Sequence, residues 1–376
     1  MGFKPLAGCG DDRKGEVFLQ DTRGRLMKKA RSLWVYPLSC ILFAGVLFIA
    51  VSLGSVRVSL SDTWNILLRY LFGIGDLEGI QSGTETIIAM VRLPRVLLAA
   101  MTGGALSLAG AVMQSLLKNP LADGSTLGVS SGGALGAVLS IVLGLRLSFF
   151  PGLGLALSSI AASFLSLIFI LTLTYRIDRS LSTNTIILTG VIFSMLAGSI
   201  TSLLVVLSGE SLKQVVFWSM GSFSGKGWEH VMLMAPVFFL GSLAMIAFSK
   251  ELNAFSLGEE QARYIGVDTR TVKLVLLVLT ACLIGVSVSV SGTIGFVGLV
   301  VPHITRMITG PDHRRLLPAS LIFGGIFMVL TDLLSRTLLS PEEFPVGVVT
   351  SFAGAVIFIV IFYRYNNRPG RKAWHG

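Results

Sequence analysis

The sequence predicts an all-α polytopic membrane protein with about ten transmembrane helices and both termini in the cytoplasm. Of its 376 residues, 53% are hydrophobic and only 13% are charged, which is about half the charged fraction of a soluble domain. The apolar runs are continuous and reach the roughly 20 residues that a helix needs to cross a bilayer. Barrel strands would give short alternating segments instead, so helices are the remaining way to pair the backbone in lipid.

The apolar stretches follow a polar, basic N-terminal segment, which we interpret as a cytoplasmic tail over residues 1–33. The membrane domain covers 34–366, and 367–376 form a second cytoplasmic tail. The polar stretch 289–295 divides one long apolar run, and we interpret it as a tight external turn between two helices. The predicted spans are 36–56, 92–116, 126–146, 152–174, 184–207, 230–249, 272–292, 294–309, 316–336 and 345–363.

The charge distribution indicates the orientation. With the N-terminus inside and alternating spans, most of the 30 Lys and Arg residues fall on cytoplasmic segments, as the positive-inside rule requires. The same rule accounts for the net charge of +10, so we predict no nucleic-acid partner. The three cysteines, Cys9, Cys40 and Cys282, have neither the pattern of a disulfide framework nor a metal-ligand spacing.

The longest cytoplasmic connection, 250–273, contains a short stretch that favours a helix. Gly258 and Gly266 bracket it, and Gly266 suits the C-terminal cap of a helix. A short amphipathic helix on such a loop can dock into a groove of a partner protein, although a solvated loop is the simpler alternative. The residues concerned are Leu257, Gly258, Glu259, Glu260, Gln261, Ala262, Arg263 and Gly266.

Three arginines stand where cations are unfavourable. Arg92 and Arg95 are three residues apart, so they share a helix face at the external N-terminus of their span, where the helix dipole disfavours positive charge. We expect an acidic group to compensate them, unless they snorkel to lipid headgroups. Arg336 lies at the external end of a later span, and Asp332 precedes it at the four-residue spacing of an ion pair.

Polar residues also occur where the chain turns on the cytoplasmic side. Asn119 and Leu121 belong to one inner connection, and Ser182 and Thr183 belong to another. Ser182 or Thr183 could simply cap the helix that follows.

The span 184–207 is unusually polar and includes Thr189 and Ser194. That polarity suits either a water-filled cavity or hydrogen bonds between helices. The sequence has no nucleotide-binding signature and no cluster of His, Asp, Glu or Cys at one bilayer depth. We therefore predict neither catalytic nor metal-ligating residues.

Several long motifs follow one another along the chain. They are Arg-Leu-Pro-Arg at 92–95 with a Gly-rich helix ending at 109–114, and the stretches 118–123, 127–132, 292–303 and 343–347. Together these motifs resemble those of the FecCD-type permeases, the membrane subunits of importers for ferric siderophores, haem and vitamin B12. The resemblance covers residues 36–363 and leaves the N-terminal tail outside.

The resemblance implies a ten-helix permease that pairs with a second copy or a close paralogue around one pathway. Its other partners would be two cytoplasmic ATPase subunits and an extracytoplasmic binding protein. ATP and Mg would be bound by the ATPases and no cofactor by this chain, which is therefore not an enzyme.

The resemblance also implies roles for the residues singled out above. The stretch 257–266 resembles the helix that couples the family's permeases to their ATPases. Arg92, Arg95 and Arg336 resemble positions that receive acidic side chains of the binding protein. The two inner connections, with Asn119, Leu121, Ser182 and Thr183, resemble the cytoplasmic gate, and the span with Thr189 and Ser194 would line the pathway.

We therefore predict the permease subunit of an ATP-binding-cassette (ABC) importer in the bacterial plasma membrane. Its ligand would be a metal chelate, with ferric siderophore preferred to haem or cobalamin because it is the commonest role in the family. An ion-coupled secondary transporter is the main alternative. It would need intramembrane carboxylates or inverted repeats, and Asp332 is the one strong candidate. A membrane-embedded enzyme, a scaffold subunit, and the choice between homodimer and heterodimer also stay open.

Overall fold

The computed structural model describes residues 36–54, 58–74, 80–124, 126–145, 154–340 and 342–366. The regular elements of this part are all helices, and its one pairing of extended residues is an isolated bridge between Leu339 and Glu342. The predicted tails, 1–33 and 367–376, lie outside the described residues.

The helices follow one another with short connections. After a first helix, Tyr36–Ser52, they are α2 (Leu60–Phe72), α3 (Ser82–Thr86), the π-helix Ile87–Arg92, α4 (Leu93–Leu116), α5 (Val129–Val142), α6 (Gly154–Ile177), α7 (Thr183–Leu207), the 3-10 turn Gly209–Ser211, α8 (Leu212–Ser219), α9 (Trp228–Ala247), α10 (Ser249–Leu257), α11 (Glu259–Tyr264), α12 (Thr269–Ser291), α13 (Val297–Thr309), α14 (His313–Thr337) and α15 (Val346–Asn366).

Six of the described helices are long and apolar enough to cross a membrane, and four shorter apolar helices accompany them. Each predicted span coincides with one of these helices, which confirms the all-α prediction. The exact number of crossings and the side on which each end lies stay predictions.

The second predicted span begins too late. The helix is continuous over Ser82–Leu116, ten residues more than the predicted 92–116. Pro94 normally stops a helix because it lacks an N–H and its ring clashes with the preceding turn. Here the turn before it is π-helical, with the N–H of Leu93 bonded to the carbonyl of Ile88, and this wider turn accommodates the ring. Sequence analysis also missed the helices α2 and α8.

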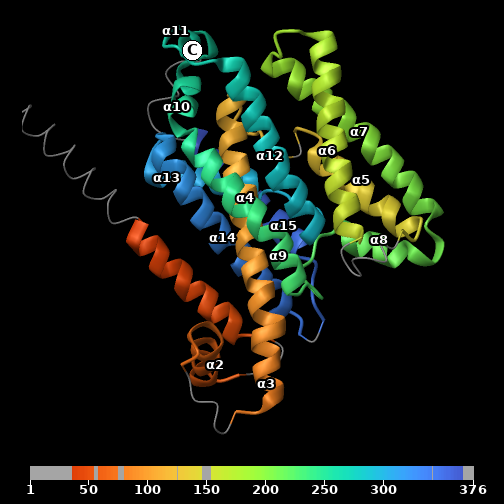
Figure 1. Cartoon of the computed structure of the whole chain (residues 1–376), viewed down its shortest axis with the longest axis vertical. Helices are drawn as coiled ribbons and strands as arrows, with labels where there is room; N and C mark the ends of the chain where they lie inside the picture. The colour runs from red at the N-terminus through yellow and green to blue at the C-terminus, as the bar shows by residue number, and fades with distance from the viewer. Residues whose placement is uncertain are drawn as a thin grey trace, which may run out of the picture. The chain divides into compact units, whose positions relative to one another are not determined.

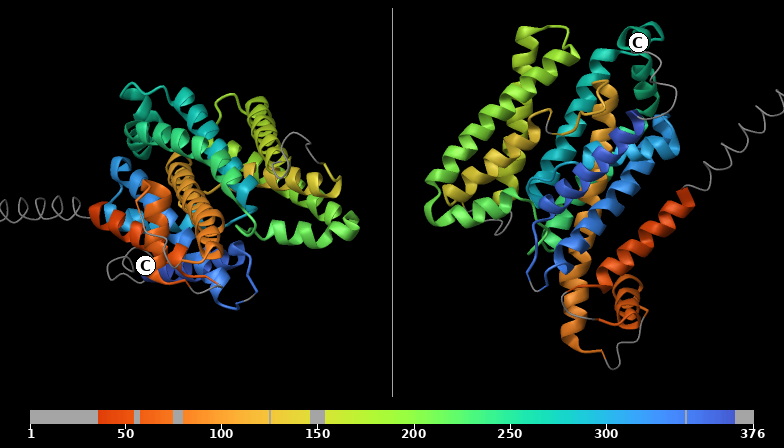
Figure 2. Two further views of the ribbon diagram at one scale, coloured as in Figure 1. Left: turned by 60° about the horizontal axis from the view of Figure 1, so that its bottom comes forward. Right: turned by 180° about the vertical axis from the view of Figure 1, so that it is seen from behind.

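Helix α4 is the centre of the described bundle. It contacts α9, α12, α13 and α14, and these helices surround it in Figures 1 and 2. Its most apolar window is 94% buried, whereas that of α7 is only 11% buried. Because an apolar helix exposed to this extent needs lipid or another protein against it, α7 presents an outer face of the chain.

Glycines bring the central helices close together. A Cβ atom on Gly103 of α4 would lie 2.3 Å from the backbone oxygen of Gly324 on α14, and one on Gly324 would lie 2.4 Å from that of Gly103. The Gly110 position is closer still, at 1.9 Å from the oxygen of Gly298 in α13. Small residues commonly permit such approach between membrane helices, so packing explains these glycines.

Helices α5, α6 and α7 contact one another and form a second group, with α12 touching both α5 and α6. The group is the yellow-green part of Figure 1. Again small residues set the distance, because a Cβ on Gly136 of α5 would lie 2.3 Å from the Cβ of Ala162 on α6. The two groups of helices enclose the site described next.

Candidate functional site

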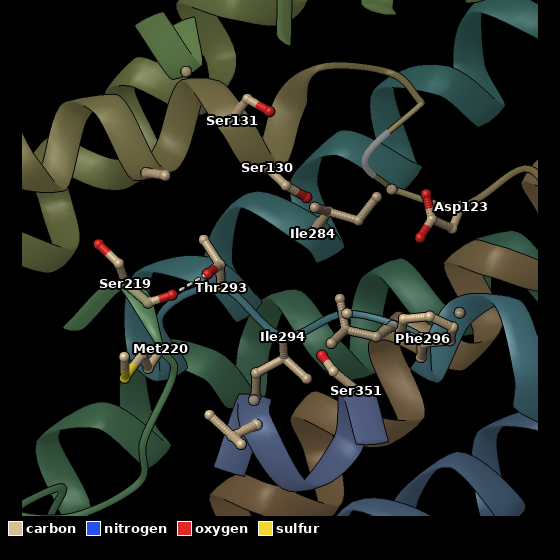
Figure 3. A pocket seen from close by; sticks show the side chains of 18 of the residues that line it. Asp123, Ser130, Ser131, Ser219, Met220, Ile284, Thr293, Ile294, Phe296 and Ser351 are labelled. Carbon is tan, nitrogen blue, oxygen red and sulfur yellow. Dashed lines mark hydrogen bonds between the residues drawn. The ribbon is translucent and has the colours of Figure 1, made fainter. Parts of the chain in front are cut away.

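A cavity of about 780 Å³ lies where the central helices meet the α5–α7 group. Eight segments contribute to its wall, which Figure 3 shows from close by. The lining consists of Leu106 from α4; Asp123 and Gly124 from the following connection; Ser130, Ser131 and Ala134 from α5; Gly198 and Thr201 from α7; Ser219 and Met220 at the end of α8; Ile284 from α12; Thr293, Ile294, Gly295, Phe296 and Gly298; and Gly347, Val348 and Ser351 from α15.

The wall combines hydroxyl groups with apolar side chains. Asp123 is the only charged residue among the described residues of this lining. Thr293 donates a hydrogen bond to the carbonyl of Ser219 (Figure 3), which ties the connection between α12 and α13 to the end of α8. A wall of this kind can solvate a polar ligand through many weak contacts without holding it tightly.

The connection between α12 and α13 differs from its prediction. It separates two helices as expected, but the segment Gly292–Phe296 has no regular structure and is not a tight turn, and four of its residues line the cavity. Phe296 has a left-handed backbone with φ of 69°, which is uncommon for a bulky residue. Its Cβ lies so near α15 that a Cβ on Gly354 would be 2.5 Å from it, so packing holds this conformation.

The predicted pathway residues of α7 do not line the cavity. Thr189 is 3% exposed, and its hydroxyl donates to the carbonyl of Thr185 at 2.8 Å within the same helix. The cavity instead meets Gly198 and Thr201, which are about one and two turns beyond Ser194. The polarity of the span was therefore informative, but only the arrangement of its neighbours selects the turns that face the cavity.

The first inner connection follows α4 and is a tight local structure. The side chain of Asn119 accepts a hydrogen bond from the N–H of Leu121 at 2.9 Å, as Asn does in turns. Leu121 is 52% exposed. Because the same connection carries Asp123 and Gly124 into the cavity wall, its conformation affects the cavity directly.

The second inner connection joins α6 to α7 and is organised by Asp178. Its Oδ1 accepts from the N–H of Ser180 at 2.8 Å and from the Ser180 hydroxyl at 2.6 Å, and its Oδ2 accepts from the N–H of Ser182 at 3.1 Å. These bonds from Ser180 and Ser182 lower the pKa of Asp178 below its ordinary value. Ser182 is the N-cap residue of α7 as predicted, although its hydroxyl contacts Thr185 at 2.9 Å rather than a backbone N–H.

The stretch 257–266 forms the predicted short helix, α11, at the top of Figure 1. Gly258 precedes it with φ of 139° and ψ of 148°, a region that only glycine visits readily. Gly266 follows it with φ of 91°, and its N–H bonds to the carbonyl of Arg263 while that of Val267 bonds to Ala262, each at 3.0 Å. This is the Schellman ending that glycine favours, so the predicted cap is confirmed.

Large apolar side chains are exposed on and around α11. Leu257, Tyr264 and Ile265 are 70%, 88% and 65% exposed, whereas Ala262 is fully buried. Glu260, Gln261 and Arg263 are exposed. Glu259 instead pairs with Lys273 of α12 at 2.9 Å. Three large exposed apolar side chains around one short helix are the pattern of a surface that a partner covers.

A buried network missed by sequence analysis anchors α10, the helix before α11. His313 at the start of α14 lies 2.5 Å from the hydroxyl of Ser115 in α4 and 2.7 Å from the side-chain oxygen of Asn253 in α10. Asn253 also donates to Asp312 at 2.8 Å. These contacts join three helices that are distant in sequence, so no local signal could have identified them.

Arg92 and Arg336 donate hydrogen bonds to the last backbone carbonyls of the first helix, Tyr36–Ser52. Arg92 donates to the carbonyls of Val51 at 3.2 Å and Ser52 at 2.7 Å, and Arg336 donates to that of Ala50 at 2.5 Å. The last carbonyls of a helix lack partners within the helix and carry partial negative charge. The compensating groups expected for these arginines are therefore partly backbone oxygens of the chain itself.

The third arginine, Arg95, binds two carboxylates. It donates to Asp332 of α14 through Nε at 3.1 Å and Nη2 at 2.9 Å, and to both oxygens of Glu343 at 2.9 and 3.0 Å. Asp332 also lies 3.4 Å from Nε of Arg336, at the four-residue spacing expected. All three arginines are less than 9% exposed. Docking of the binding protein on them stays a prediction.

The comparisons with known proteins agree on one family. The model of the FecCD transport family matches residues 41–364. The chain is 42% identical to an uncharacterized ABC transporter permease of Bacillus subtilis, YvrB, over 93% of this chain and 98% of that protein. It is 36% identical to the hemin transport permease HmuU of Yersinia pestis, over 88% and 97% of the two chains.

A third relative and a solved structure extend this result. The cobalamin import permease BtuC of Halobacterium salinarum is 37% identical over 75% of each chain. The solved structure, described as a metal-chelate type of ABC transporter in an inward-facing conformation, superposes with a TM-score of 0.75 at 33% identity, over 87% of this chain and 97% of that one.

The bundle of apolar helices around a hydroxyl-lined cavity is thus that of a multi-pass membrane permease. The chain belongs to the FecCD transport family and is the permease subunit of an ABC importer, not an enzyme, because the ATPase of such importers is a separate subunit. This membership rules out the ion-coupled secondary transporter and the membrane-embedded enzyme considered from the sequence.

Proposed function

We propose that the chain forms the pathway through which a metal chelate, in the form of a ferric siderophore, crosses the bacterial plasma membrane. The cavity of about 780 Å³ carries this proposal, because its size is in the range of sites for small-molecule ligands. Its hydroxyl and apolar wall suits a ligand whose metal is already held by a chelator. The relatives support the class, since one is a hemin permease and the solved structure is of the metal-chelate type.

Haem and cobalamin are the alternatives within the same mechanism. A further relative, MolB of Haemophilus influenzae, is named as a molybdate permease. Molybdate is a small free oxyanion, whereas the size of the cavity and its hydroxyl and apolar wall suit a larger chelate.

The proposed positions of the other importer subunits follow from the two ends of the helix bundle. We expect the end with α11 to face the cytoplasm, where Leu257, Tyr264 and Ile265 would enter a groove of an ATPase. Permeases of ABC importers work with ATPase subunits and a substrate-binding protein. Two ATPase subunits, which bind ATP and Mg, and a second copy or paralogue of this chain would complete the assembly.

The opposite end would receive the binding protein. Arg92, Arg95 and Arg336 are engaged within the chain, so a docking carboxylate would have to compete with Glu343 for Arg95. Glu343 is 36% exposed in its side chain and is the accessible member of the network. Asn119, Leu121, Ser182 and Thr183, on the two inner connections, would form the gate toward the cytoplasm.

ATP-dependent uptake by proteoliposomes tests the proposal. The chain is purified with its co-purifying subunits, and ferric hydroxamate and catecholate siderophores, haem, cobalamin and molybdate are offered with the matching binding proteins. Uptake of a ferric siderophore that is lost without ATP is the expected result. Uptake of haem or cobalamin instead would correct the substrate, and uptake of molybdate alone would contradict the metal-chelate class.

A further inference from the structure

A buried lysine joins the two segments that the proposed mechanism must connect. Lys273 is the fifth residue of α12, and its side chain is only 2% exposed. Its ammonium group, which has three N–H donors, has three oxygen partners. These are the two carboxylate oxygens of Glu259, each at 2.9 Å, and the carbonyl oxygen of Leu181 at 3.1 Å.

These partners belong to different functional segments. Glu259 is the first residue of α11, the short helix whose apolar side chains are exposed for a partner. Leu181 lies in the connection between α6 and α7, next to Ser182 and Thr183 of the predicted gate. Lys273 is therefore the point at which the partner-facing helix and the gate connection share one hydrogen-bond donor.

The connection between α6 and α7 has a backbone conformation that depends on contacts such as the hydrogen bond from Lys273. Leu181 has φ of 53°, in the left-handed region that is unfavourable for a leucine. Strained conformations of this kind persist only where the surroundings impose them. Two features stabilise this conformation of Leu181. Its side chain is buried, at 3% exposed, and its carbonyl accepts a hydrogen bond from Lys273.

The ion pair between Lys273 and Glu259 is also sensitive to movement of α11. A buried ammonium group without its carboxylate is strongly unfavourable, so Lys273 follows Glu259 or exchanges it for other oxygens. Either response changes the bond to Leu181, because both acceptors use one nitrogen. A displacement of α11 is thus transmitted to the strained leucine without passing through the rest of the bundle.

We propose that Lys273 is a positioning residue that transmits movement of α11 to the connection between α6 and α7. The inference rests on the proposed function, in which an ATPase moves α11 and this connection gates the pathway. It assigns a role to a lysine that is not among the described residues lining the cavity, and it makes Glu259 the charged residue of α11 that binds within the chain.

A labelling experiment on the whole importer tests this role. Cys9, Cys40 and Cys282 are replaced by serine, and the exposed Arg179, beside the strained leucine, becomes the reporter through R179C. The chain is co-expressed with its ATPase and reconstituted in proteoliposomes. The rate of maleimide labelling is measured with and without ATP and vanadate, which needs no transported ligand.

The lysine and its partner are then substituted in this background. K273M removes the charge, K273R retains a cation, and E259Q removes only the ion pair from a carboxylate that is 33% exposed. K213M is the matched control, because Lys213 is an exposed lysine of α8 in a different region. We expect K273M to reduce the nucleotide-dependent change in labelling by about two- to thirtyfold, which is the range for residues along such connections.

The outcomes separate the possibilities. K273R and K213M should respond to nucleotide as the parent does, and E259Q should lose part of the response although the ATPase remains bound. Normal responses in K273M and E259Q, or a parent whose labelling ignores nucleotide, would overturn the inference. If the K273M variant fails to assemble with the ATPase, the labelling response of E259Q tests the inference instead. A parent that binds no ATPase at all would contradict the proposed function itself, so the two failures are distinct.

Discussion

Arg95 of α4 and Asp332 of α14 form a buried ion pair with a distance of 2.9 Å, although 237 residues separate them in the chain. Asp332 is 1% exposed and also faces Arg336 at 3.4 Å. One carboxylate therefore serves two guanidinium groups inside the bundle. This arrangement explains how an acidic residue is retained in an apolar helix, where an isolated carboxylate would be energetically unfavourable.

Replacing Asp332 with asparagine should strongly destabilise the protein. D332N leaves Arg95 and Arg336 close together without the negative charge between them, and loss of one partner of a buried pair destabilises by about 3–5 kcal/mol. The check is thermal unfolding in detergent, followed by tryptophan fluorescence. E343Q is the control, because a partly exposed pair contributes about 0–1 kcal/mol. Equal shifts of the melting temperature in both variants would contradict the expectation.

The contact between α4 and α14 should not tolerate a methyl group. In G324A the new Cβ would lie 2.4 Å from the backbone oxygen of Gly103, and since backbone cannot move aside as a side chain can, we expect a loss of about 1–3 kcal/mol in unfolding free energy. G45A is the matched control in the first helix, where no atom lies within 4 Å of the added Cβ. Comparison of melting temperatures in one detergent decides; G324A as stable as G45A would refute the close packing.

Gly258 should be needed for the position of α11. Its backbone region is nearly exclusive to glycine, and a non-glycine residue held there costs about 1–3 kcal/mol, which would release the start of the helix. We expect G258A to lower the amount of ATPase that co-purifies with the chain while leaving the yield of the chain itself similar. G83A, a helical glycine with free space around it, should have no effect. Unchanged ATPase binding in G258A would show that α11 does not require this conformation.

The connection between α6 and α7 should respond to acid through Asp178. Hydrogen bonds from Ser180 and Ser182 lower its pKa in the folded chain, so its contribution to stability is present above the unfolded value of about 3.9 and is lost as pH falls through the lower folded value. D178N should therefore melt below the wild type near neutral pH, and the difference should shrink under acid conditions. A difference that is constant with pH would exclude this charge as its source.

The sequence was a good guide to elements whose signal is local. Each apolar stretch became a helix, because length and hydropathy act residue by residue. The bracketing of α11 by Gly258 and Gly266 was equally legible, since the backbone conformations they adopt are a property of glycine itself. The π-helical turn before Pro94 could not be predicted, because a proline considered alone predicts the start of a helix. Only the structure shows that the helix is continuous and that the turn before Pro94 is a wider, π-helical one.

The residues that line the cavity were not predicted from the sequence. The polar character of α7 suited either a cavity or hydrogen bonds between helices. The wall uses Gly198 and Thr201 rather than Thr189 and Ser194, because the rotation of a helix is set by its neighbours. The three arginines were recognised as needing negative partners. Their partners include backbone oxygens of the first helix, which no pattern of side chains reveals.

By itself, the sequence determined that this protein is helical, lies in a membrane and belongs to the permeases that resemble it, because composition, span length and ordered motifs are all carried along the chain. The tertiary structure alone decided which turns face the cavity and which charges meet. Lys273, Glu259 and Leu181 come together only when α11, α12 and the connection after α6 are packed. Contacts between such distant residues depend on helix rotation and depth, and neither is encoded in local spacing.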